Sequence, residues 1–319
     1  MKKSKEEWIT LFRNEADKVL SLACKQSVRK KRANVINNKV KRFSAEVIEK
    51  IKRNAKDEKW NNEVLLNEIL LATYASYIVM LEYRNRVWPY EYMAFARRIG
   101  ELWEPFCKLP FEYPVRPLKL IDPPDFEKVQ EGMKKQTTDY ISSLRISSDE
   151  KKILKYYYGI LWSLVDSGGI KLGLDLHFDQ EGIHYNCDFK SGFSSNEKGN
   201  TNRLLLVGSI YQALGKNEKT ILFVRQEEAQ NNHYLQTLKN SPYWSCYCAK
   251  DCYSKMEEFT GFNLRTWLDN NVDWKNDISA EFRKHLIEND LIGYCQPLLK
   301  MSQNKTGFRH KNWIFYAKV

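Results

Sequence analysis

The chain has 319 residues, of which 43% are hydrophobic and 13% aromatic, and its formal net charge at pH 7 is +11. This content of core-forming side chains excludes a disordered chain, and the length fits one large domain or two ordinary ones. Seven cysteines and no secretory leader argue against a secreted disulfide scaffold and predict a cytoplasmic protein. The longest apolar run, residues 69–81, is shorter than the roughly 20 residues that span a bilayer, so we expect no membrane insertion.

The positive charge is concentrated at the two ends of the chain. Residues 1–60 hold 18 basic and 8 acidic side chains, and residues 296–319 hold 5 basic and no acidic ones. Residues 25–42 contain no acid and include a run of four cations: Arg29, Lys30, Lys31 and Arg32. Such a cluster attracts polyanions such as nucleic acid, and it is also typical of a solvated helix face.

The first part of the chain predicts helices. Ser44 can cap one helix and Asn62 the next, while Pro89 and Pro105 predict the start and end of a helix over residues 90–104. The proline-rich stretch 109–125 predicts an extended connector. Two further helices are expected over residues 126–144 and 149–164.

The second half alternates between strands and helices. Strands are expected at residues 172–178 and 183–189, joined by a four-residue turn, and a polar loop over 191–203 precedes a helix. Further strands at 220–224 and 244–249 predict a mixed sheet with helices packed on it.

The hairpin has one apolar and one polar face. If Phe178 faces Ile183, then His177 faces His184 and Asp175 lies diagonally to Asp188. The apolar side chains are Leu174, Leu176, Phe178, Ile183, Tyr185, Cys187 and Phe189. The polar ones are Asp175, His177, His184, Asn186, Asp188 and Lys190.

The polar face has the groups that phosphodiester hydrolysis needs. Two nearby carboxylates repel each other unless a cation joins them, and Mg²⁺ prefers one or two carboxylates together with water and phosphate oxygens. Lys190 follows Asp188 by two residues, so its ammonium can orient the attacking water and stabilise charge on phosphate. The alternative is a solvent-facing hairpin with an ordinary Asp–Lys surface pair.

The order strand, Asp175, turn, strand, Asp188-Phe189-Lys190 resembles the PD-(D/E)xK nuclease superfamily, and within it the type II restriction endonucleases. The resemblance implies that Asp175, Asp188 and the backbone carbonyl of Phe189 bind one or two Mg²⁺ ions, and that Lys190 serves the water. It also implies a further acid on the helix that opens the core. Glu101 and Glu104 are the two candidates for that acid.

The expected fold is therefore α+β, with an αβββαβ core around a mixed central sheet and a large helical N-terminal region. We expect a helical basic region over residues 1–90, for DNA clamping or dimer contacts, and a nuclease core over 91–319 with a helical insertion at about 109–166 and a basic C-terminal segment.

The expected function is Mg²⁺-dependent cleavage of double-stranded DNA at a short specific sequence. Two active sites cut both strands of a symmetric site most simply, so we expect a homodimer. The resemblance also implies a cognate DNA methyltransferase that acts on the same sequence and need not bind this chain. Two alternatives stay open: a structure-directed repair or junction-resolving nuclease, and an inactive DNA-binding protein on a nuclease fold.

Several other groups have both a functional and a structural interpretation. In the polar loop, Lys198, Asn200, Asn202 and Arg203 suit backbone phosphates, or the loop is merely flexible. Near the end, Arg309 and Lys311 lie among aromatic residues, as on a nucleic-acid surface or an edge strand. The spacing of Cys246, Cys248 and Cys252 allows zinc, although buried thiols are favoured. The two histidines of the hairpin could bind phosphate or metal, although simple hydrogen bonding is favoured.

Overall fold

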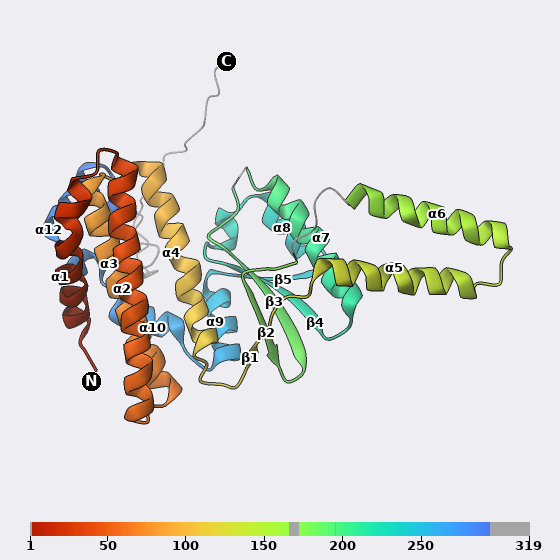
Figure 1. The fold of residues 1–319 in the computed structure, drawn as a ribbon, viewed down its shortest axis with the longest axis horizontal. Coiled ribbons are helices and arrows are strands. Elements are labelled where there is room, and N and C mark those ends of the chain that lie inside the picture. Colours follow the sequence, from red (N-terminus) through yellow and green to blue (C-terminus); the bar gives the residue numbers. More distant parts are fainter. Residues whose placement is uncertain (1, 166–171, 195, 294–319) are drawn as a thin grey trace, which may run out of the picture.

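The computed structural model describes residues 2–165, 172–194 and 196–293. Figure 1 shows a helical part at one side, a central sheet with helices on both faces, and a helical hairpin that projects from the sheet on the other side. The protein is thus a mixed α+β fold, as the sequence predicts.

The N-terminal part is formed by helices that run alternately up and down: α1 (Lys5–Cys24), α2 (Arg29–Asp57), α3 (Asn62–Val87) and α4 (Tyr92–Glu112). Ser4 caps α1 in a capping box with Glu7, and Asn61 rather than Asn62 caps α3. The prediction that Ser44 begins a helix is wrong, because α2 continues through it. Buried residues before that position, such as Ile36 and Val40, pack in the bundle and extend the helix.

Helix α3 lies at the centre of this part. Among the described residues it is the one helix long and apolar enough to cross a membrane, with a mean hydropathy of 1.7 in its most apolar window. However, 78% of that window is buried inside the protein, against α1, α2 and α4. The core helix of a soluble protein has the same properties, so burial in the protein accounts for the apolar character of α3.

Helix α4 continues past the proline that was expected to end it. Pro105 and Pro110 both lie inside the helix. Proline removes a hydrogen bond from a helix interior, at a cost of about 3 kcal/mol. The buried faces on either side, which include Trp103 and Phe106, pack between the helical part and the sheet and outweigh that local preference.

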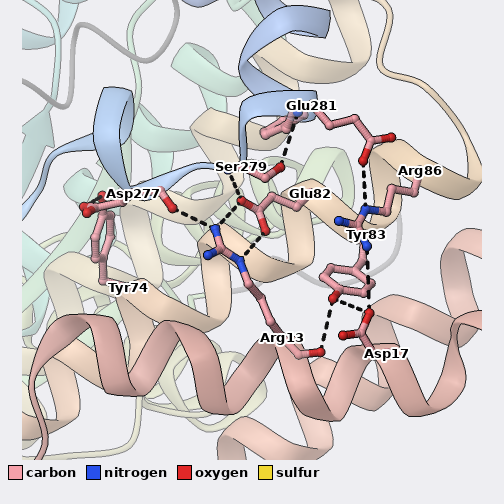
Figure 2. A network of polar contacts seen from close by, with 10 residues as sticks. Arg13, Asp17, Tyr74, Glu82, Tyr83, Arg86, Asp277, Ser279 and Glu281 are labelled. Carbon is pink, nitrogen blue, oxygen red and sulfur yellow. Dashed lines mark hydrogen bonds and ion pairs between the residues drawn. The ribbon is translucent and has the colours of Figure 1, made fainter.

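The C-terminal helices return to the N-terminal ones. They are α9 (Ala249–Thr260), α10 (Leu264–Asn271), α11 (Trp274–Asp277) and α12 (Ala280–Glu288). Figure 2 shows the polar network that joins α11 and the start of α12 to α1 and α3. Arg13 donates to both oxygens of the buried Glu82, at 3.0 and 2.7 Å, and to the carbonyl of Asp277. The N–H of Ser279 also donates to Glu82, so part of the predicted second domain shares a core with the first helices.

The sheet has the strand order β1-β2-β3-β4-β5. Its strands are β1 (Lys119–Leu120), β2 (Leu176–Gln180), β3 (Ile183–Lys190), β4 (Glu218–Val224) and β5 (Trp244–Cys248). The first three strands are antiparallel, and β4 and β5 run parallel to β3. Helices α4 and α9 cover the face of Phe189 and Phe223, while α7 (Lys198–Leu214) and α8 (His233–Lys239) cover the face of Leu222 and Val224.

A helical hairpin is inserted between β1 and β2, close to the predicted insertion. It consists of α5 (Phe126–Ser143) and α6 (Ser148–Val165), at nearly the expected boundaries. The hairpin is attached to the body through α5, where Val129 packs against Val207 and Tyr211 of α7. Helix α6 extends away from the body (Figure 1).

The hairpin of β2 and β3 has the predicted faces but a different register. The turn is the two-residue pair Glu181-Gly182, with φ of 57° and 78°, rather than four residues. Two central residues with positive φ form the type I′ turn that matches strand twist. Phe178 therefore pairs with Tyr185 rather than Ile183. A slip of two residues keeps every side chain on its face, so the apolar face remains buried.

Candidate functional site

The polar face of the hairpin lies under α7 and contains a hydrogen-bonded network. His177 pairs with Asn186 across the strands, and its Nδ1 lies 2.7 Å from the Asn186 Oδ1. The Asn186 amide donates to Glu218, which lies 2.8 Å from His184 Nδ1. The predicted pairing of His177 with His184 is therefore wrong, since the two-residue turn shifts His184 to face Asp179.

The contacts of His177 define its state. Its Nε2 accepts from the N–H of Leu174 at 2.9 Å, so the proton lies on Nδ1 and is donated to Asn186. Burial lowers the pKa of His177, which keeps the imidazole neutral. These contacts agree with the hydrogen-bonding interpretation of the histidines.

The two predicted acids meet at the other end of the hairpin. Strand β2 begins at Leu176, which pairs with Cys187, so Asp175 lies in a bend directly before the strand, at the end where Asp188 follows Cys187. Asp175 accepts the N–H of Phe189 at 2.8 Å through Oδ2. Because the N–H and C=O of one strand residue point to the same side, the carbonyl of Phe189 also faces Asp175. Asp175 is thus held against the backbone of Phe189, and its charge is close enough to Asp188 to raise the pKa of that carboxyl.

Asp188 is the most buried of these groups, with 1% of its surface exposed. Lys190 Nζ lies 2.6 Å from its Oδ1, and an Nη of Arg203, on α7, lies 3.2 Å from its Oδ2. Burial raises the pKa of Asp188 and the nearby charge of Asp175 raises it further, although the two cations act in the opposite direction. The carboxylate is therefore held in an environment that disfavours its charge.

The donor set fits a hard divalent cation. The carboxylates of Asp175 and Asp188 are the oxygen ligands that such an ion prefers, and the ammonium of Lys190 lies against Asp188 Oδ1. No group of three or more His, Cys, Asp or Glu side chains that could hold a metal occurs in the described part of the chain. Mg²⁺ needs no such group, because it is usually bound through one or two carboxylates, water and substrate phosphates.

The two candidate helix acids lie on the opposite side of the sheet end. Helix α4 approaches Ser191, since a Cβ on Gly100 would lie 3.0 Å from the serine Oγ. Glu101 is paired with Arg97 and Arg98, at 2.8 and 3.0 Å, and Glu104 with Lys108, at 2.7 Å. In the described part of the chain, the ion-pair partners of both glutamates are thus side chains of α4 itself.

The predicted polar loop is shorter than expected, because α7 begins at Lys198. Lys198 and Asn202 are exposed, and Asn200 donates to Glu197 Oε2 at 3.0 Å. Arg203, predicted as a DNA contact, instead contacts the site through Asp188. Its position one turn into the helix next to Asp188 depends on how α7 packs on the sheet, which a single sequence does not specify.

The basic run lies at the start of α2, with Arg29, Lys30 and Lys31 exposed. Because the helices alternate in direction, this end of α2 is also the end at which α4 begins (Figure 1). The first half of α4 approaches Ser191, directly after the site lysine. Arg309 and Lys311 fall outside the described residues.

Arg225 and the cysteines near β5 lie close to the end of the sheet. Arg225 follows β4 and donates its N–H to the carbonyl of Lys190 at 2.9 Å. Its Nε and Nη1 are buried and have no hydrogen-bond partner among the described residues. Cys252 is buried and Cys246 and Cys248 are partly buried, and burial raises the pKa of the Cys246 thiol to about 12 and that of Cys248 to about 11.

Comparisons of the chain with protein-family models, with curated proteins and with solved structures found no match. The function must therefore be argued from the site itself.

Proposed function

We propose that the chain is a Mg²⁺-dependent endonuclease of the type II restriction kind, built on a PD-(D/E)xK core. The order of elements supports this proposal: α4, the antiparallel strands β1 to β3, α7 and the parallel strand β4 follow one another as in an αβββαβ core, with α5 and α6 inserted. A mixed sheet covered by helices on both faces is compatible with that core.

The observation that carries the proposal is the meeting of Asp175, Asp188 and Lys190 at one end of the β2–β3 hairpin. An ordinary surface ion pair would be solvated, whereas Asp188 is buried beside a second carboxylate. Retaining a charge in such an environment costs stability, so we infer a function for it.

The side chains have separate roles in the proposed reaction. Asp175, Asp188 and the Phe189 carbonyl would hold Mg²⁺. The bound ion would polarise the phosphate and lower the pKa of a water molecule. Lys190 orients the attacking water and stabilises the negative charge that develops on the phosphate. Arg203 neutralises Asp188 before substrate binds and can then contact a phosphate, since its side chain is 38% exposed.

The substrate that fits the charge distribution is double-stranded DNA. The exposed cations Arg29, Lys30, Lys31 and Lys198 would contact backbone phosphates, which position a duplex without reading its sequence. A homodimer would present two sites to the two strands of a symmetric sequence. Such an enzyme would act in the cytoplasm alongside a DNA methyltransferase of the same specificity.

Cleavage of plasmid DNA with Mg²⁺ tests the proposal, with Asp188→Asn and Lys190→Ala as the site variants. Asp57→Asn is the matched control, because Asp57 and Lys59 form the same Asp-x-Lys pattern at the exposed end of α2. We expect discrete fragments from the wild type and the control, and none from the site variants. Smeared products or a preference for branched DNA would favour a repair nuclease, and binding without cleavage by the wild type would contradict the proposal.

A further inference from the structure

Helix α6 presents apolar side chains to solvent. Tyr156 and Tyr157 are 67% and 62% exposed, and the same face includes Ile153, Leu154 and Leu161, which are 53%, 41% and 61% exposed. These five residues, which we call the α6 face, occur within nine consecutive positions. A helix with so much exposed apolar surface usually has a partner.

We propose that the α6 face is the interface with a second copy of this chain. The pattern is self-complementary, because Ile153, Tyr157 and Leu161 form a ridge with a spacing of four residues that is symmetric about Tyr157. A twofold axis through Tyr157 sets Ile153 against Leu161 of the partner subunit and Tyr157 against the partner's Tyr157. Interdigitation of such ridges is the commonest way in which two helices pack.

The exposed apolar area is close to that of a dimer interface. The two tyrosines contribute roughly 130 Å² each and the three aliphatic side chains roughly 50 Å² each, or on the order of 400 Å² in all. A standard interface of about 800 Å² per partner is about 57% apolar, which requires a similar amount.

Charge and shape also favour a second copy over a polyanion. Residues 126–165, which form the helical hairpin, hold seven basic and five acidic side chains, unlike the strongly basic first 60 residues. Two copies can therefore approach without strong repulsion. The helical hairpin projects from the body, so its outer helix is accessible to a partner without interference from the rest of the chain (Figure 1).

This inference deepens the homodimer of the proposed function. The molecular mass in solution tests it, without DNA or Mg²⁺. The interface can therefore be disproved even if the chain cleaves DNA. Light scattering during gel filtration of the full chain should give twice the mass of 37.8 kDa. Tyr157→Glu should weaken the dimer by roughly thirtyfold or more, as for a central interface residue, and leave the circular dichroism spectrum unchanged. Ile287→Glu, at an equally exposed residue of α12, is the control and should remain dimeric.

A mixing experiment tests the position of the twofold axis. Tyr157→Glu and Tyr157→Lys should each be monomeric, because like charges would meet across the axis. Mixed in equal amounts, they should form a heterodimer. A wild type that is monomeric throughout the micromolar range would overturn the inference. A Tyr157→Glu variant as dimeric as the wild type, or a mixture that stays monomeric, would overturn it as well.

Discussion

Replacing Asp188 by asparagine should stabilise the protein while abolishing its proposed activity. The variant keeps the shape of the side chain and removes a charge from a group that is 1% exposed. It weakens the ion pairs with Lys190 and Arg203, but the raised pKa indicates that the burial cost and the repulsion from Asp175 outweigh those pairs. Relief of such a cost typically contributes about 0.5–2 kcal/mol. For a chain of this size that corresponds to roughly 1–6 °C in Tm.

The pH dependence gives a second signature of the same effect. The folded state binds a proton on Asp188 more tightly than the unfolded chain does, so this group lowers stability as pH rises from its ordinary value of 3.8 through the raised pKa. The stability gap between the variant and the wild type should therefore be largest at neutral pH and shrink as the pH falls through that window.

Thermal melts in buffer with EDTA, followed by a titration with Mg²⁺, measure both effects. Mg²⁺ should raise the Tm of the wild type, because it binds the folded state, and should have a much smaller effect on the variant. Two results would refute the argument that the buried charge of Asp188 destabilises the protein until a cation binds. They are a lower Tm for Asp188→Asn in EDTA, and an equal rise in Tm with Mg²⁺ in both proteins.

Four variants test other parts of the account. Lys190→Ala should lose cleavage but keep the Mg²⁺-induced rise in Tm, because the lysine does not bind the ion; loss of both in a folded variant would contradict its assigned role. Arg203→Ala should lower the Mg²⁺ concentration at the midpoint of the Tm titration, since the guanidinium competes for Asp188, and a higher midpoint would oppose this. Arg13→Ala should destabilise the fold by about 3 kcal/mol in urea denaturation, because a buried carboxylate loses its partner. Arg86→Ala, whose acidic partners are exposed, should cost less than about 1 kcal/mol, and equal losses in the two variants would argue against this account of the network.

The faces of the β2–β3 hairpin could be predicted from the sequence because side chains alternate strictly along a strand. The register could not, since it depends on whether the turn uses two residues or four. Glu181 adopts a positive φ that few non-glycine residues favour, so the shorter turn was not anticipated. Because the error was two residues, the predicted faces were still correct, although Asp175 lies in a bend before β2 rather than within the strand.

Packing between distant segments explains the other differences. Pro105 is a local signal for the end of a helix, but the side chains around it are buried between the helical part and the sheet, and α4 continues. The approach of Arg203 to Asp188 likewise depends on how α7 lies on the sheet. Asp277 and Ser279 hold the last helices against the first ones through hydrogen bonds with Arg13 and Glu82. Neither residue belongs to a recognisable sequence motif.

The central claim is that Asp175 and Asp188 together hold a divalent ion. Electron paramagnetic resonance with Mn²⁺, used in place of Mg²⁺, counts the ions bound per chain. We predict one or two bound ions for the wild type, a marked loss for Asp175→Asn and for Asp188→Asn, and no loss for Asp57→Asn. Binding that persists in both site variants, or a wild type that binds no Mn²⁺ either alone or with DNA, would contradict the account.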